Sequence, residues 1–203
     1  MITIDDITIV RDGREIIYDY SEQIPAGSIT VIVGPNGCGK STLLAAIAGD
    51  IAPIKGTITI DDVHPILTSP AQLAKIRAVA MQNQSYTLGF TVTQIIEMAG
   101  ASTQVMQALD LSALAHRQVT ALSGGESARV SIATAIAQKT PVLLLDEPLA
   151  AQDVHSKKRI IELLQKLAEN GVTVVVVVHS SESELAWATT TTVTPFSANF
   201  CKS

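Results

Sequence analysis

The stretch Gly34-Pro35-Asn36-Gly37-Cys38-Gly39-Lys40-Ser41-Thr42 decides the fold, because it matches the G-x-x-x-x-G-K-[ST] pattern of phosphate-binding loops. It follows an apolar run at 29–33 and opens a helix-like run that Gly49 stops. Its glycines let backbone N–H groups turn toward phosphate oxygens, and the following helix adds its positive end. We therefore expect a nucleotide site in which Lys40 reaches the β- and γ-phosphates and Ser41 can ligate Mg²⁺. A glycine turn with a chance Lys-Ser pair is the alternative, which the strand and helix on either side disfavour.

The composition favours one cytoplasmic domain. The chain has 203 residues, of which 47% are hydrophobic and 3% aromatic. Its apolar runs, 174–178 among them, are far short of the roughly 20 residues that a membrane-spanning helix needs, and residues 1–6 do not resemble a signal peptide. Cys38 and Cys201 do not form a disulfide framework, which favours a reducing cytosol. The net charge of −5 gives no electrostatic case for a nucleic-acid partner.

Apolar runs and amphipathic segments alternate along the rest of the chain, which predicts an α/β fold with buried parallel strands. Residues 83–121 differ, because no strand-like run interrupts their helical spacing, and we interpret them as a helical insertion. The N-terminal region reads as a small β region with a turn at 11–14. The predicted strands are 7–10, 16–18, 29–33, 56–60, 78–81, 141–145 and 172–178, with at most one more in the tail; the predicted helices are 43–48, 69–76, 93–98, 105–109, 111–116, 128–138 and 155–169.

Two further predicted strands end in residues that suit phosphoryl transfer. Asp146 and Glu147 follow the apolar run 142–145, and His179 follows the run 172–178. Ligands of open α/β sheets gather at the carboxyl ends of the strands. Asp146 suits a carboxylate that holds Mg²⁺, directly or through water, and Glu147 would then orient and deprotonate the attacking water. Such a pair, and a lone strand-end histidine, often lie in ordinary loops, so the phosphate loop carries this interpretation.

A second glycine-rich element, Leu122-Ser123-Gly124-Gly125-Glu126, precedes the helix predicted from residue 128. Its N–H groups, the Ser123 hydroxyl and the helix N-terminus would make another anion site. An ordinary capped helix start is the alternative.

Together these motifs resemble an ATP-binding cassette (ABC) ATPase over residues 1–185. The resemblance lies in the order of the phosphate loop, Gln82 after a short strand, LSGGE, VLLLDEP, Asp153 and the strand-end His179. Residues 80–82 with 89–92, and residues 137–141, are similar to the importer class that serves iron chelates, haem and vitamin B12. The resemblance implies a P-loop NTPase (RecA-like) core formed by residues 1–82 and 128–203, with an N-terminal antiparallel β region and a helical subdomain at 83–127.

The resemblance also implies roles for individual residues. The Walker B strand would end in the catalytic Glu147, with Gln82 contacting Mg²⁺ or the attacking water and His179 contacting the γ-phosphate. Asp153 would lie at a dimer interface. The residues that would contact ATP are the Walker A loop (Gly34, Pro35, Asn36, Gly37, Cys38, Gly39, Lys40, Ser41 and Thr42), Arg11 on adenine, and, over the ATP of a second copy, Ser123, Gly124, Gly125 and Glu126; the Mg²⁺ ligands would be Ser41, Gln82 and Asp146.

The partners that the resemblance implies are a second copy and a membrane transporter. Two chains would pack head to tail as a homodimer around two ATP molecules. The helical subdomain would contact integral membrane permease subunits, and a substrate-binding protein would act indirectly, so the chain would lie on the inner face of the cell membrane. The expected function is the ATP-hydrolysing subunit of an importer; the alternatives are a small exporter's ATPase, a soluble ABC ATPase of DNA repair or translation, or a catalytically silent subunit.

Two positions depart from the family pattern. Arg11 stands where the family usually has an aromatic residue that stacks on adenine, although a guanidinium can also stack on a base. Gln152 stands before Asp153, where the family favours leucine. Cys38 invites a redox hypothesis, because a helix N-terminus lowers the pKa of a thiol, but a permissive loop position is the simpler interpretation.

Overall fold

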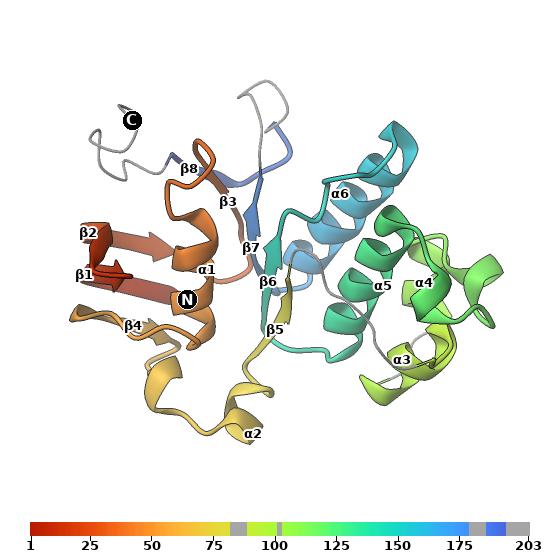
Figure 1. Ribbon diagram of the computed structural model, residues 1–203, viewed down its shortest axis with the longest axis horizontal. Coiled ribbons are helices and arrows are strands. Elements are labelled where there is room, and N and C mark those ends of the chain that lie inside the picture. Colours follow the sequence, from red (N-terminus) through yellow and green to blue (C-terminus); the bar gives the residue numbers. More distant parts are fainter. Residues whose placement is uncertain (82–88, 101–102, 179–185, 194–203) are drawn as a thin grey trace.

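Two β-sheets face each other across helix α1 in the computed structural model, which describes residues 1–81, 89–100, 103–178 and 186–193 (Figure 1). The smaller sheet is antiparallel with strand order β2-β1-β4, and the larger sheet is parallel with order β5-β6-β7-β3-β8. These sheets confirm the predicted P-loop NTPase class with an N-terminal antiparallel region. The strands are β1 (Ile2–Arg11), β2 (Arg14–Ile24), β3 (Ile29–Val33), β4 (Lys55–Ile60), β5 (Arg77–Ala80), β6 (Val142–Asp146), β7 (Thr173–Val177) and β8 (Thr190–Val193).

The parallel sheet is buried on both faces. Every residue of β3, β6 and β7 is buried. Alternate residues of β6 enter different hydrophobic clusters: Leu144 packs with α1 (Lys40–Ala48) and the antiparallel sheet, whereas Leu143 packs with the helices on the opposite face. Because successive side chains of a strand point to opposite faces, one continuous apolar run supplies two cores.

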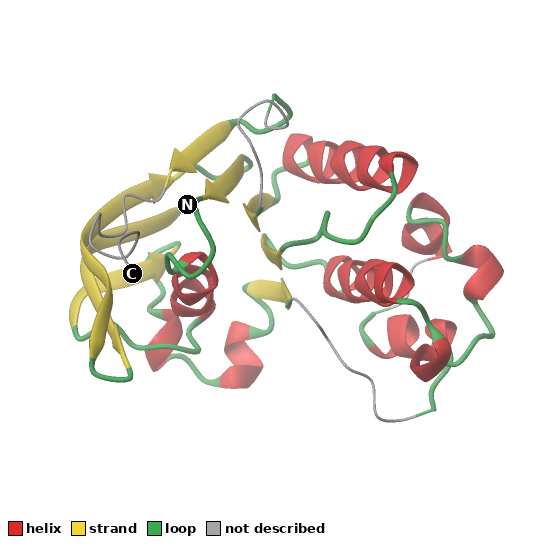
Figure 2. Ribbon diagram, turned by 45° about the horizontal axis from the view of Figure 1, so that its top comes forward, coloured by secondary structure: helices red, strands yellow, loops and turns green. Residues whose placement is uncertain are grey.

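The face of the parallel sheet opposite α1, at the right in Figure 2, is covered by the helices α3 (Val92–Met98), α4 (Thr103–Ala108), α5 (Gly124–Ala137) and α6 (Val154–Glu169). Helices α5 and α6 contact the strands, and α3 and α4 contact α5. None of the described helices is long and apolar enough to cross a membrane. The short elements are α2 (Pro70–Leu73), with Ser69 as the predicted N-cap, and three 3-10 turns, Pro65–Leu67, Ser112–Leu114 and Val119–Ala121.

The first two strands extend well beyond the predicted runs 7–10 and 16–18. Ile2, Ile4, Ile7 and Ile9 are all buried, although Asp5 and Asp6 interrupt their alternation. The pairing of β1 with β2 shifts register between Ile4 and Ile7, and Asp6 has a left-handed φ of +48°. A β-bulge at this point absorbs the extra residue and returns the isoleucines to the core face.

Three helix predictions were wrong in extent. The segment 69–76 forms only the one-turn helix α2, Pro70–Leu73. The segment 111–116 forms only the turn Ser112–Leu114, because the carbonyls of Ala115 and Arg117 accept the N–H groups of Thr93 and Val92 at 3.1 Å and start α3 instead of continuing a helix. Helix α5 begins at Gly124 and not at residue 128, so it runs through the predicted subdomain boundary at 127/128. Ser123 therefore caps this helix, and Gly124, Gly125 and Glu126 form its first turn.

Candidate nucleotide-binding site

The phosphate loop joins β3 to α1 with the backbone that its glycines allow. Gly37 and Gly39 have φ of +75° and +105°, in the region that disfavours side chains. Gly39 is the N-cap of α1, and no side chain caps this helix. The N–H groups of its first turn therefore remain available to an anion, as expected of a phosphate-binding helix end.

Lys40 lies folded over the loop that precedes it. Its Nζ donates to the carbonyl oxygens of Gly34 and Pro35 at 2.8 and 2.9 Å. The side chain is only 5% exposed. A buried ammonium needs partners of this kind, and phosphate oxygens are stronger ones because both groups then carry charge.

A pocket of about 340 Å³ opens beside the loop, within the size range of ligand pockets. Glu147 reaches it from the end of β6, and Ile16 from β2 adds an apolar wall. Sequence reasoning missed Ile16; the burial of its neighbour Ile17 in the core shows why Ile16 must face the other way. The lining residues are Ile16, Asn36, Gly37, Gly39, Lys40, Ser41, Thr42 and Glu147.

Ser41 and Asp146 meet at the base of the loop. The Ser41 hydroxyl donates to Asp146 Oδ1 at 3.2 Å, and Asp146 is 6% exposed. Hydroxyl and carboxylate oxygens are ligands that Mg²⁺ accepts, and Mg²⁺ commonly uses one or two protein ligands beside phosphate and water. Among the described residues no group of three or more His, Cys, Asp or Glu side chains could hold a metal. The pair therefore fits an ion shared with a nucleotide.

Glu147 is held in a strained backbone conformation. Its φ is +53°, and its N–H donates to the carbonyl of Val177 on β7 at 3.0 Å. The left-handed region costs a residue with a side chain about 1–3 kcal/mol, and it is common at functional sites. The side chain is 8% exposed and lines the pocket. The structure thus aims a carboxylate at the space beside the phosphate loop.

The predicted signature residues begin α5 with a capping box. The Glu126 carboxylate accepts from Ser123 N at 2.7 Å, and Ser123 Oγ accepts from Glu126 N at 3.3 Å. The Ser123 N–H is the main reason that the pKa of Glu126 is lowered. Arg117 Nη1 lies 3.3 Å from the same carboxylate. The pocket of the same chain is lined by none of the four residues Ser123, Gly124, Gly125 and Glu126.

Several other predicted site residues do not line this pocket: Gly34, Pro35 and Asp146, which lie at the start and base of the loop, and Arg11, Cys38 and Asp153. Arg11 is exposed at the end of β1, opposite Arg14. Cys38 is 9% exposed and packs into the cluster around α1. Asp153 caps α6: its carboxylate accepts from Ser156 N and Oγ at 2.9 and 2.8 Å, and these bonds lower its pKa. Their predicted contacts with nucleotide or a second copy stay predictions.

Gln82 and His179 lie outside the described residues, so their predicted roles in catalysis and metal binding also stay predictions. Cys201 lies outside them as well.

Comparison with known proteins places these features in one family. The family model described as "ABC transporter" matches residues 17–150, which include the loop, Ser123–Glu126 and Glu147. The chain is 39% identical over 198 residues to the hemin import ATP-binding protein HmuV of Rhodococcus jostii, covering 91% of this chain and 68% of that protein. It is 40% identical over 174 residues to the cobalamin import ATP-binding protein BtuD of Halobacterium salinarum, covering 78% and 43%.

Among solved structures, the dimeric structure of a bacterial ABC transporter cassette superposes with a TM-score of 0.81 at 26% identity, covering 95% of this chain and 94% of that one. This chain spans about two thirds of the length of the hemin import relatives. The phosphate loop, the Ser41–Asp146 pair and Glu147 occupy the region that the family model matches. The chain belongs to the ABC transporter family, as one of its ATP-binding-cassette ATPases.

Proposed function

We propose that this chain is the ATP-binding and ATP-hydrolysing subunit of a membrane importer of the hemin or cobalamin type. The observation that carries the proposal is the single pocket that Lys40, Ser41 and Glu147 share. The importer class rests on relatives named for hemin and cobalamin import at 39% and 40% identity.

The phosphate loop is the part of the chain that would bind ATP. The uncapped N-terminus of α1 and the N–H groups of the loop would bind the β- and γ-phosphates. Lys40 would exchange its contacts with two backbone carbonyls for contacts with phosphate oxygens. Ser41 and Asp146 would hold Mg²⁺, which when bound neutralises charge on the phosphates. Arg11 or Ile16 would face the base and sugar.

Glu147 is proposed as the catalytic base. Its carboxylate borders the pocket, and the backbone bond to Val177 fixes its position. In this role it orients the attacking water and takes its proton, with Gln82 and His179 contacting the metal or the γ-phosphate. Loss of such a base costs about 10²–10⁴ in rate.

The second half of each site is proposed to come from a second copy. Ser123 to Glu126 line no part of their own chain's pocket, which supports a head-to-tail dimer that closes over two ATP molecules. Asp153 would lie at the interface. ATP would favour the closed dimer, and a swing from 1:99 to 99:1 requires about 5.5 kcal/mol of differential binding.

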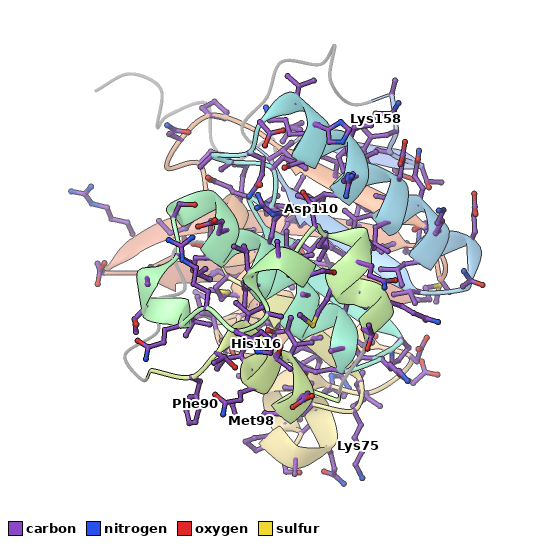
Figure 3. All side chains as sticks on the ribbon, turned by 90° about the vertical axis from the view of Figure 1, so that its right-hand side faces the viewer. Lys75, Phe90, Met98, Asp110, His116 and Lys158 are labelled. Atoms are coloured by element: carbon purple, nitrogen blue, oxygen red, sulfur yellow. The ribbon has the colours of Figure 1, made fainter. Side chains whose placement is uncertain are left out.

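The helical segment is proposed to contact the permease, with the chain on the inner face of the membrane. Phe90 and Met98 expose apolar side chains there, at 36% and 64%. Both project from the lower edge of the helical face in Figure 3. An apolar patch on an exposed face would mark a contact surface, and these two side chains would belong to it.

The test is the Glu147→Gln substitution in the purified chain. We expect ATP binding to be retained, turnover to fall by about 10²–10⁴, and ATP to trap a dimer on a sizing column. Turnover like that of the unsubstituted chain, from a monomer, would overturn the proposal. Uptake of labelled hemin or cobalamin by cells that express the chain with the permease and binding-protein genes beside its own would test the importer class, and export activity would contradict it.

A further inference from the structure

The first turn of α5 is tied to the loop between β6 and α6 by one buried amide. Gln152 is 8% exposed. Its Nε2 donates to the carbonyl of Gly125 at 3.0 Å, and its Oε1 accepts from Arg129 Nη1 at 3.0 Å. Both polar ends of the side chain are therefore used, one on the signature turn and one on the next turn of the same helix.

The two backbones also touch beside this amide. A Cβ added to Gly125 would lie 2.8 Å from the carbonyl oxygen of Ala151, closer than such atoms approach. Ala151 itself has a left-handed φ of +55°. Glycine at position 125 and the turned backbone at Ala151 together let the loop and the helix meet at this distance.

The same short loop carries Glu147 at its other end. The Glu147 carbonyl accepts from Ala150 N at 3.1 Å, and Asp153 ends the loop as the cap of α6. A displacement of the signature turn would therefore act on Gln152 and, through the four-residue segment between them, on the backbone of Glu147.

Leucine in place of Gln152 would make neither hydrogen bond. The Gly125 carbonyl would lose this donor and Arg129 this acceptor; among the described residues Arg129 Nε already has no partner. The Gly125 carbonyl would keep its helical partner, but a second buried N–H of Arg129 without an acceptor would be costly. Glutamine in place of the family's leucine thus adds a polar link, for which Gly125 and Arg129 supply the matching acceptor and donor.

We propose that Gln152 is a positioning residue that makes the signature turn and the Glu147 loop of one chain move together. The inference rests on the proposed function, in which Glu147 acts on the chain's own ATP and the signature turn acts on the partner's ATP. Closure of one chain's signature on the partner's nucleotide would then set the position of Glu147 at its own.

The test compares Gln152→Leu with Gln165→Leu. Gln165 is a matched control, because its Nε2 also donates to a backbone carbonyl, that of Trp187 at 3.5 Å, away from the site. We expect Gln152→Leu to leave the affinity of the monomer for a fluorescent ATP analogue unchanged. We expect it to lower kcat about tenfold, to bring the Hill coefficient for ATP close to one, and to weaken ATP-driven dimerisation in the Glu147→Gln background. Gln165→Leu should change none of these.

Gln152→Glu separates the two hydrogen bonds. Its carboxylate still accepts from Arg129 but cannot donate to the Gly125 carbonyl. Values like those of Gln152→Leu support the link to Gly125, and values like those of the unsubstituted chain overturn it. Thermal unfolding of each variant shows whether the fold is intact; because Gln152→Glu keeps the Arg129 contact, it tests the link even if Gln152→Leu unfolds.

These experiments separate failure of this inference from failure of the proposed ATPase function on which it rests. If the Glu147→Gln chain binds ATP but stays monomeric, the proposed dimer fails and the inference with it. If that chain dimerises and Gln152→Leu matches Gln165→Leu in kcat, Hill coefficient and dimerisation, only the inference is overturned.

Discussion

Helices α1 and α5 both begin at glycine-rich turns, yet they close their first turns in opposite ways. At α1 the N-cap is Gly39, and no side chain caps the free N–H groups. At α5 Ser123 and Glu126 cap each other in a reciprocal pair. The third helical residue makes much of the difference, because Thr42 leaves the end of α1 open whereas Glu126 places a carboxylate at the end of α5.

This difference separates two ways of binding phosphate. The open end of α1 can receive an anion within its own chain. The end of α5 already carries a negative charge, which Arg117 partly balances at 3.3 Å. A phosphate that approaches α5 would therefore need accompanying cations, which Lys40 and Mg²⁺ of a second chain would supply in the proposed dimer.

Removal of the ammonium at α1 is expected to have the largest effect. Lys40→Met deletes a charged donor in the pocket, and bonds to charged groups contribute about 1.5–3 kcal/mol each, so affinity for ATP should fall about 10- to 100-fold. Equilibrium binding of a fluorescent ATP analogue measures this loss. Lys158→Met is the control, since Lys158 is exposed on α6 with Glu162 3.9 Å away. Equal ATP affinities for Lys40→Met and Lys158→Met would contradict the prediction that the N-terminus of α1 binds phosphate within its own chain.

Removal of the cap at α5 should act on stability and not on nucleotide binding by the monomer. Ser123→Ala deletes the acceptor for Glu126 N, and loss of an N-cap costs about 1 kcal/mol of unfolding free energy. Urea unfolding with and without ATP measures both quantities. Thr91→Ala is a matched positive control, because Thr91 and Gln94 cap α3 in the same way, and Ser112→Ala is a negative one. A fall in the monomer's ATP affinity for Ser123→Ala would show that the two helix ends are not independent.

The smallest expected effect is a pH dependence from Glu126. Its folded pKa is lowered below the ordinary 4.5, first by the Ser123 N–H. Its contribution to stability is therefore complete above about pH 4.5 and is lost as the pH falls through the folded pKa. Solvent screens this partly exposed group, so the change is small. Unfolding measured from pH 6 to pH 3 should show a shallower decline for Glu126→Gln than for the unsubstituted chain; parallel curves would contradict the prediction.

The features of the site that could be predicted from sequence are those that a few neighbouring residues determine. Gly37, Gly39 and Lys40 lie within four residues of one another and determine the phosphate loop locally. The apolar run before Asp146 predicts a buried parallel strand, whose carboxyl end must lie at the same edge of the sheet as the phosphate loop. The fold class and the phosphate loop therefore follow from sequence.

What the sequence did not predict depends on contacts across the chain. The bulge at Asp6 extends β1 only because distant strands pair with it, and the turn Ser112–Leu114 is short because the start of α3 takes the carbonyls of Ala115 and Arg117 that follow it. Ile16 gives no distinct signal until its strand is placed beside the loop. Gln152 was visible as a departure from the family, but its partners Gly125 and Arg129 appear only in three dimensions.

Because both faces of β6 are buried, adjacent residues of this strand pack against different parts of the molecule. Leu144 supports α1 and hence the floor of the nucleotide pocket, whereas Leu143 supports the helices that face the proposed permease. The parallel sheet thus separates two hydrophobic cores, and each of its buried strands contributes side chains to both. Trimming Leu144 would loosen the packing around α1 and the antiparallel sheet, and trimming Leu143 the packing of the helices proposed to contact the permease, although the two residues are neighbours in sequence.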